Sequence, residues 1–294
     1  MSTSHTRLGV LVGVDGSPAS KVAVEWAAKE ASMRGLPLSL VHVIPSSLPR
    51  TWPDVPNPPE LQHWYELNGE EILALARQVA EPATGSNIKV SSETISGSPT
   101  ATLIDLSKEA ELVVVGCLGL GAIARRLLGS VSAALVHHAH CPVAVIHDDE
   151  PLMPTAAMAP VVVGIDGSPA SEVATAIAFD EASRRGVELV AVHAWSDNSA
   201  YELPGLEWST LEAQAEEALA ARLAGWQERY PDVTVRRVVV LDRPAHQLLK
   251  QSDSAQLTVV GSHGRGGFAG MLLGSVSSSV AQSARTPVIV ARPS

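Results

Sequence analysis

The sequence has few cysteines, no long apolar run and no signal-peptide pattern. Cys117 and Cys141 are the only cysteines among 294 residues, which excludes a disulfide framework and is typical of a reducing compartment. No uninterrupted apolar stretch approaches the ~20 residues of a membrane-spanning helix. Residues 1–7 are polar, with no apolar signal core behind them. We therefore expect a cytoplasmic protein without a membrane span.

Positive charge and the signatures of common catalysts are also lacking. The formal net charge is -10 at pH 7, which argues against non-specific binding to nucleic acid or to an anionic membrane. The sequence has no Gly-x4-Gly-Lys-Ser/Thr loop, no serine nucleophile elbow and no protein-kinase signature. No general base directed at a γ-phosphate is recognisable either. The sequence therefore favours binding over catalysis.

The chain contains an internal repeat. Residues 12–20 (VGVDGSPAS) recur as residues 163–171 (VGIDGSPAS), and residues 127–132 (LLGSVS) recur as residues 272–277. Hydrophobic residues make up 46% of the chain, so each half can bury its own core. The connector is rich in proline, which suits an extended linker. We predict a first domain at residues 1–147, a linker at 148–160 and a second domain at 161–294.

Strand-length apolar runs alternate with segments of helical period in each half. Ser17 and Pro18 are suited to the N-cap and the first position of a helix, and Gly35 to its end. This alternation predicts an α/β fold with a parallel sheet that helices cover on both faces. We expect strands near residues 9–14, 38–44, 112–115 and 143–146, and helices near residues 18–35, 60–80 and 210–229.

A glycine pattern follows the fourth expected strand of each half. Gly-x2-Gly-x9-Gly-Ser occurs as Gly116, Gly119, Gly129 and Ser130, and again as Gly261, Gly264, Gly274 and Ser275. Glycine allows positive φ and a close approach of N–H groups to an anion. The helix expected after it offers free N–H groups and about half a positive charge. The pattern predicts a phosphate-binding cradle, with the Ser130 and Ser132 hydroxyls as further donors. The alternative is a tight strand exit followed by a helix cap.

Asp15 and Asp166 follow the first expected strand of each half. In an open parallel sheet, ligands bind beyond the carboxyl ends of the strands. A carboxylate there can accept hydrogen bonds from ribose hydroxyls or assist a magnesium ion on a phosphate. The alternative is an Asp turn that binds its own backbone. Beside a cradle, ligand contact is the favoured interpretation.

Several histidines and cysteines have structural and chemical interpretations. His42 and His193 precede the turn after the second strand and are interpreted as structural, with a catalytic role as the alternative. His137, His140 and Cys141 would share one helix face, an arrangement that could hold a metal ion, but the second half has Gln282, Arg285 and Thr286 there. Cys117 is interpreted as a small apolar residue, with a redox-sensitive thiol as the alternative. We therefore predict no metal site.

These residues resemble the universal stress protein family in its tandem two-domain form, over nearly the whole chain. The similarity rests on Val-Gly-Val/Ile-Asp-Gly-Ser, on Val-His after the second strand, on the two cradles and on the final Pro-Val strands. The resemblance implies two tandem Rossmann-like domains, each a five-stranded parallel sheet in the order 3-2-1-4-5. It also implies pairing of the domains through their last strands, ATP as ligand, and a regulatory role in stress response and growth control.

The resemblance also implies roles for individual residues. Asp15 and Asp166 would lie at the ribose and phosphates, and the backbone of Val43 and Ala194 would face adenine. The first phosphate site would comprise Gly116, Gly119, Gly129, Ser130, Val131 and Ser132. The second would comprise Gly261, Gly264, Gly274, Ser275, Val276 and Ser277. Magnesium with the ATP, a homodimer and an unidentified regulatory protein partner stay open.

The two halves differ within the cradle and after the second strand. The first cradle has Cys117, Leu118 and Leu120 where the second has Ser262, His263 and Arg265. We therefore predict weaker ATP binding in the first half. The proline-rich loop at residues 45–59 lies on the ligand side and is interpreted as a rigid connector, with a role at the adenine end as the alternative. A slow ATPase, an adenylyl-transferring enzyme and a structural dimerisation module are the competing functions.

Overall fold

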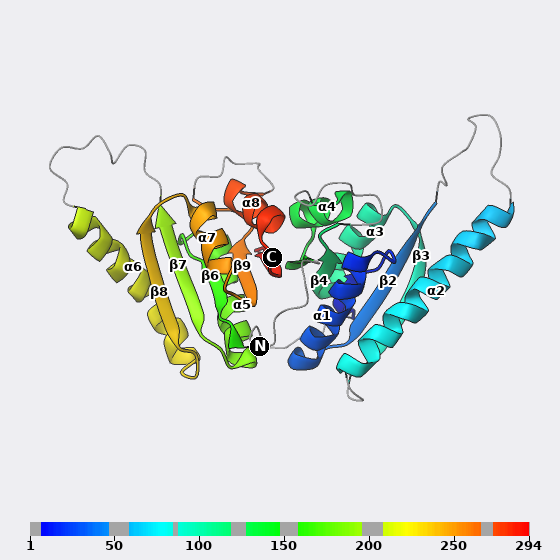
Figure 1. The fold of residues 1–294 in the computed structure, drawn as a ribbon, viewed down its shortest axis with the longest axis horizontal. Helices are drawn as coiled ribbons and strands as arrows, with labels where there is room; N and C mark the ends of the chain where they lie inside the picture. The colour runs from blue at the N-terminus through cyan, green and yellow to red at the C-terminus, as the bar shows by residue number, and fades with distance from the viewer. Residues whose placement is uncertain are drawn as a thin grey trace. The chain divides into compact units, whose positions relative to one another are not determined.

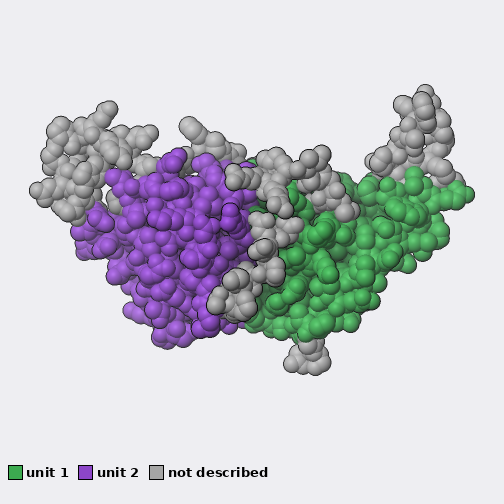
Figure 2. Space-filling model, in the orientation of Figure 1, with its two compact units in different colours: residues 1–148 green, residues 149–294 purple. Residues whose placement is uncertain are grey.

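The computed structural model describes residues 7–46, 59–84, 88–118, 128–147, 158–195, 208–265 and 273–293. The chain divides into two compact units, residues 1–148 and residues 149–294 (Figure 2). Most of the predicted linker, residues 148–157, lies outside the described residues. Among the described helices, none combines the length and the apolar character needed to cross a membrane.

Unit 1 is a parallel five-stranded sheet in the order β3-β2-β1-β4-β5. This confirms the predicted order 3-2-1-4-5. Its strands are β1 (Gly9–Gly13), β2 (Leu38–Pro45), β3 (Val90–Gly97), β4 (Ala110–Gly116) and β5 (Val143–Ile146). Its helices are α1 (Pro18–Arg34), α2 (Pro59–Thr84), α3 (Pro99–Leu106) and α4 (Ser130–His138), with a short 3₁₀ turn at Ser107–Glu109.

Unit 2 repeats the arrangement, with parallel strands in the order β8-β7-β6-β9-β10. Its strands are β6 (Val161–Gly164), β7 (Leu189–Trp195), β8 (Val235–Leu241), β9 (Leu257–Gly261) and β10 (Val288–Ala291). Its helices are α5 (Pro169–Arg185), α6 (Trp208–Arg229), α7 (Pro244–Ser252) and α8 (Ser275–Ser283). The pairing of the two domains through their last strands stays a prediction.

Helices cover both faces of each sheet (Figure 1). In unit 1, α1 packs against α2, and α3 packs against α4. The chain moves outward from β1 to β3 and then crosses to β4 and β5. Because such parallel crossovers are right-handed, the two helix pairs lie on opposite faces. The direction of winding reverses between β1 and β4, and between β6 and β9, so ligands are expected at these points.

The helix limits confirm the predicted caps. Ser17 is the N-cap of α1, and its hydroxyl accepts the backbone N–H of Ser20. Gly35 ends the helix with φ of 66°, in the left-handed region, which glycine adopts without steric cost. In unit 2, Ser168 and Gly186 do the same for α5. These caps fix where α1 and α5 begin, directly beyond the ends of β1 and β6.

The strands at the centre of each sheet are buried on both faces. Val10, Leu11 and Val12 of β1 are fully buried, as near-continuous apolar runs in parallel sheets predict. In α6, Leu219 and Leu223 are four residues apart, so they lie on one face of the helix, and both are buried. The ring of Phe179 in α5 stacks at 6.0 Å, between centroids, on Trp226 of α6. The core therefore fixes the strand ends on which the candidate site stands.

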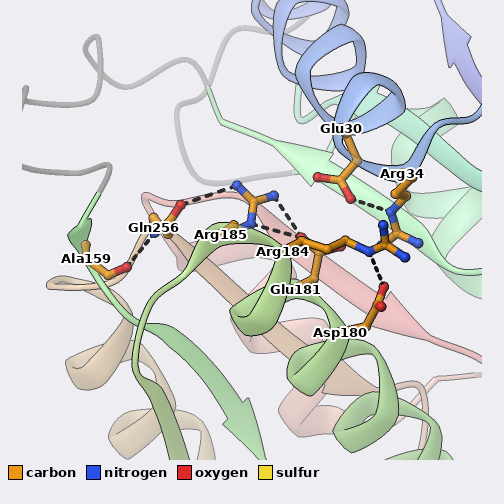
Figure 3. Close-up of polar contacts among 8 residues, drawn as sticks. All are labelled: Glu30, Arg34, Ala159, Asp180, Glu181, Arg184, Arg185 and Gln256. Carbon is orange, nitrogen blue, oxygen red and sulfur yellow. Dashed lines mark hydrogen bonds and ion pairs between the residues drawn. The ribbon is translucent and has the colours of Figure 1, made fainter. Parts of the chain in front are cut away.

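An ion pair within α5 is connected to the point where the chain enters unit 2. The buried carboxylate of Glu181 accepts a 2.9 Å hydrogen bond from Nε of Arg185. Arg185 also donates to Gln256 at 3.3 Å, and the Gln256 amide donates to the carbonyl of Ala159 at 2.6 Å (Figure 3). This network fixes Ala159, which lies two residues before the start of β6.

Candidate functional site

Asp15 and Asp166 lie in the turn after the first strand of each unit. Oδ1 of Asp15 accepts the backbone N–H of Ser17 at 3.0 Å and its hydroxyl at 2.6 Å. Oδ1 of Asp166 accepts the backbone N–H of Ser168 at 2.9 Å. These contacts form the Asp turn that the sequence left open as the alternative interpretation. One carboxylate oxygen in each unit therefore shapes the turn.

The second oxygen of Asp166 contacts the cradle of unit 2. Oδ2 accepts the backbone N–H of Arg265 at 3.0 Å. It also lies so close to Gly264 that a Cβ there would come within 2.5 Å of it. Glycine at this position therefore permits the approach of an anionic oxygen to the loop backbone. A phosphate oxygen is also anionic and can accept a hydrogen bond from a backbone N–H in the same way.

Both cradles are closed by the same backbone hydrogen bond. The N–H of Gly129 donates to the carbonyl of Cys117 at 2.7 Å, and the N–H of Gly274 donates to the carbonyl of Ser262 at 2.7 Å. Each bond joins the exit of the fourth strand to the start of the last helix of its unit. The helix N-terminus is thus held at the carboxyl edge of the sheet in both units.

The residues predicted to bind phosphate form the first turns of α4 and α8. N–H groups in the first turn of a helix have no partner inside the helix, and the helix dipole makes this end positive. The side chains of Ser130 and Ser275 are exposed there, and those of Val131 and Val276 are half-buried. Both turns therefore offer backbone donors and an accessible hydroxyl at one place.

The Ser132 and Ser277 hydroxyls have a different role from the one predicted. Ser132 is buried, and its hydroxyl lies 3.0 Å from the carbonyls of Cys117 and of Gly129. The buried Ser277 hydroxyl donates to the carbonyl of Gly261. A hydroxyl has one proton to donate, so these two bind the strand exit instead of adding donors for phosphate. Their backbone N–H groups remain part of the helix turn.

None of the described cradle glycines has a positive φ, and Gly116 and Gly261 serve a close approach between a helix and the sheet. Gly129 and Gly274 have φ of -59° and -75°, values that any residue adopts. At Gly116, a Cβ would lie 2.8 Å from the backbone of Ala19, and at Gly261 it would lie 2.6 Å from the backbone of Ala170. These two glycines let α1 and α5 approach the sheet. Gly119 and Leu120 lie outside the described residues.

Val43 and Ala194 lie near the carboxyl ends of β2 and β7. The N–H of Val14 donates to the carbonyl of Val41 at 2.9 Å, and β1 ends here. Backbone groups two residues apart on a strand point to the same side, so those of Val43 face the space beyond β1. Ala194 stands in the same relation to Ile165 and Val192 in unit 2. Both residues can present backbone groups to a ligand beyond the first strand.

His42 and His193 hold the second strand of each unit to the first. Nδ1 of His42 lies 2.7 Å from the carbonyl of Val14, and Nδ1 of His193 lies 2.7 Å from the carbonyl of Ile165. Because a carbonyl only accepts, both rings carry the proton on Nδ1. This confirms the structural role expected for the two histidines.

Unit 2 has polar contacts between its first loop and its cradle. The Ser168 hydroxyl donates to the carbonyl of His263 at 3.1 Å. The hydroxyl of Ser262, which is buried, lies 3.0 Å from Nδ1 of His263. In unit 1 the position of Ser262 is taken by Cys117, which is buried as well. The side chain at this position is therefore hydrogen-bonded to the cradle loop in unit 2.

The predicted sharing of a helix face by His137, His140 and Cys141 is wrong. Helix α4 ends at His138, and its C-cap Ala139 is extended. His140 and Cys141 therefore lie beyond the helix and do not share a helix face with His137. Among the described residues, no group of three or more histidine, cysteine or acidic side chains could hold a metal ion. Of the proline-rich loop, residues 47–58 lie outside the described part of the chain.

Arg222 lies at the first loop of unit 2, which was not predicted. A Cβ at Gly167 would come within 2.4 Å of its Cζ. In unit 1 the same contact is made by Ile72 with Gly16, at 3.1 Å from the corresponding Cβ position to Cγ1. An alignment of the two long helices, α2 and α6, would have placed Ile72 opposite Arg222. The glycine motifs of the repeat do not include this position.

Known proteins share the sequence and the fold. The model of the universal stress protein family matches residues 9–147 and again residues 158–292. Universal stress protein Rv2005c of Mycobacterium tuberculosis is 57% identical over 100% of both chains. Universal stress protein Rv2623 of the same organism is 55% identical over 100% of this chain and 99% of its own. A solved universal stress protein from Archaeoglobus fulgidus, 22% identical, has the same fold over 97% of this chain and 96% of its own, with a TM-score of 0.70.

Proposed function

The chain belongs to the universal stress protein family, and we propose that it binds ATP and acts as a nucleotide-dependent regulatory switch in stress response and growth control. The observation that carries the proposal is the contact between Asp166 and the backbone N–H of Arg265. It places an anionic oxygen against a backbone donor of the cradle, beside the N-terminus of α8. That is the environment that a nucleotide phosphate requires.

The proposed binding mode assigns one part of ATP to each element. In unit 2, the backbone N–H groups at the start of α8 and the Ser275 hydroxyl bind phosphate oxygens. Asp166 binds the ribose hydroxyls, and the backbone of Ala194 faces adenine. In unit 1, Ser130, Asp15 and Val43 take these places. A magnesium ion shared by the phosphates and the aspartate is compatible with this mode, because carboxylate and phosphate oxygens are its usual ligands.

The proposed role is regulatory. A protein that binds ATP in the cytoplasm can report the nucleotide level if its bound form differs in affinity for a partner. The partner in this proposal is another protein or a second copy of the chain. ATP turnover is not part of the proposal, because its support comes from backbone donors and a ribose-binding carboxylate, which bind without catalysing.

Nucleotide released from the purified protein tests the proposal. The protein is denatured, the supernatant is separated by chromatography, and the refolded or nucleotide-free protein is titrated with ATP in a calorimeter. We expect adenine nucleotide in the supernatant and saturable ATP binding. Absence of both results would refute ATP binding. A phosphate-release assay on the same sample distinguishes a binding protein from a slow ATPase.

A further inference from the structure

The guanidinium of Arg222 lies flat on the first loop of unit 2. A Cβ at Gly167 would be 2.4 Å from Cζ of Arg222, 2.5 Å from Nη2 and 2.6 Å from Nη1. Three nearly equal distances mean that the glycine meets the face of the planar group. The N–H donors lie in that plane and point away from the glycine. Gly167, with φ of 77°, thus contacts the Arg222 guanidinium and leaves the N–H donors of the guanidinium pointing away from the loop.

One carboxylate contacts this cation, and the contact is weak. Nη1 of Arg222 lies 3.3 Å from Oε1 of Glu172, and the two side chains are 39% and 45% exposed. Exposed pairs of this kind contribute little to stability, so Arg222 can exchange this partner at little cost. Its planar fork binds phosphate oxygens in a bidentate manner better than a single carboxylate oxygen at this distance.

The position of Arg222 relates it to the candidate nucleotide site. Gly167 directly follows Asp166, whose Oδ2 contacts the cradle at Arg265. Arg222 therefore contacts the residue next to the aspartate that contacts the cradle. A ligand whose phosphates start at α8 and whose ribose meets Asp166 passes beside this loop.

The first unit lacks this cation. There Gly16, with φ of 81°, meets Cγ1 and Cδ1 of Ile72, at 3.1 Å and 3.2 Å from the Cβ position. An isoleucine offers no donor and no charge at the same place in the fold. The two units can therefore be compared directly, because unit 1 has an apolar residue at the place where unit 2 has an arginine.

We propose, on the basis of the proposed function, that Arg222 binds a phosphate group of the nucleotide in unit 2 and selects charged nucleotides there. The first unit, with Ile72, binds mainly through the nucleoside and the cradle. Ligand charge therefore matters more in unit 2 than in unit 1.

Two substitutions exchange the residues between the units. Each is made in a chain that retains one working cradle, Gly129→Ala to observe unit 2 and Gly274→Ala to observe unit 1. We expect Arg222→Ile to weaken ATP binding by roughly 10- to 100-fold, the range of a lost hydrogen bond between charged groups, and adenosine binding by less than about twofold. Ile72→Arg should strengthen ATP binding in unit 1 and leave adenosine binding unchanged.

A third variant should change the ATP affinity of unit 2 in the opposite direction from Arg222→Ile. Glu172→Gln removes the competing carboxylate, so we expect tighter ATP binding and unchanged adenosine binding. Equal losses for ATP and adenosine in Arg222→Ile, or no loss for either, would overturn the inference while leaving ATP binding itself intact. If the unsubstituted protein binds no ATP, the proposed function fails first. Circular dichroism and thermal unfolding verify that each variant is folded.

Discussion

Single residues of the cradle divide into those that pack the fold and those that face the ligand side. Gly261 lies against the backbone of Ala170, where any side chain would collide with a helix. At Gly274 a Cβ would lie 3.4–3.7 Å from the backbone of residues 262–264, which is ordinary van der Waals contact. The two glycines of one motif therefore differ in what their substitution disturbs.

Gly261→Ala is expected to destabilise unit 2, and Gly274→Ala is expected to leave it folded. The first change forces β9 and α5 apart, which costs about 1–3 kcal/mol in an otherwise well-packed region. The second costs less than about 1 kcal/mol because the backbone conformation suits alanine. Urea unfolding of both variants measures the difference. Similar midpoints for the two proteins would contradict this assignment of roles.

The stability of the protein should depend on pH through the carboxylate of Asp242. The pKa of Asp242 lies well below its usual range because of hydrogen bonds from His246, from the Gln247 amide and from the backbone N–H of Arg243. A folded-state pKa below the unfolded one contributes stability above pH of about 4, and this contribution is lost as pH falls through the folded value. Asp242→Asn should therefore flatten the loss of stability between about pH 4 and pH 2, measured by acid titration of the unfolding midpoint. An unchanged acid limb would argue against the contribution.

At the scale of elements, the ends of α1 and α5 combine a local cap with a buried ion pair. The pair Glu30–Arg34 in α1 corresponds to Glu181–Arg185 in α5, with a fully buried glutamate in each. Glu25 and Lys29 form a pair at the same four-residue spacing, but both side chains are exposed. The spacing is visible in the sequence, whereas burial comes from the fold.

Arg34→Ala should destabilise the protein far more than Lys29→Ala does. Removing the arginine leaves the buried Glu30 carboxylate without this partner, which costs about 3 kcal/mol. Lys29 pairs with Glu25 in water, so its loss costs less than about 0.5 kcal/mol. Thermal and urea unfolding compare two variants of one helix. Equal effects would mean that burial of Glu30 does not make its partner important.

The whole molecule carries two copies of one fold whose candidate sites differ. The caps, strand order, histidine contacts and cradle-closing hydrogen bonds are the same in both units. The differences lie in the side chains around them, with Cys117 and Ile72 in unit 1 and Ser262 and Arg222 in unit 2. Because the backbone donors are shared, the proposed phosphate binding extends to both units, and we expect the side chains to adjust its strength.

Gly274→Ala should therefore reduce ATP binding by the intact chain more than Gly129→Ala does. The added methyl group occupies space in the cradle of unit 2, which has the polar and cationic side chains. Calorimetric titration of both variants, beside the unsubstituted protein, gives the affinity and the number of sites. A larger loss from Gly129→Ala would reverse the predicted order of the two sites.

The repeat and the limits of α1 follow from the sequence, and the strand order follows from the family resemblance. Caps such as Ser17 and Gly35 act on groups within about four residues, so local sequence suffices to place them. Three contacts come from the fold alone: Ser132 with the strand exit, Asp166 with Arg265, and Arg222 with Gly167. These contacts join residues that are 15 to 99 positions apart or on different elements, and packing of the whole unit chooses them. The repeated cradle was legible in the chain, while the difference between its two copies depends on which distant side chains the fold brings to it.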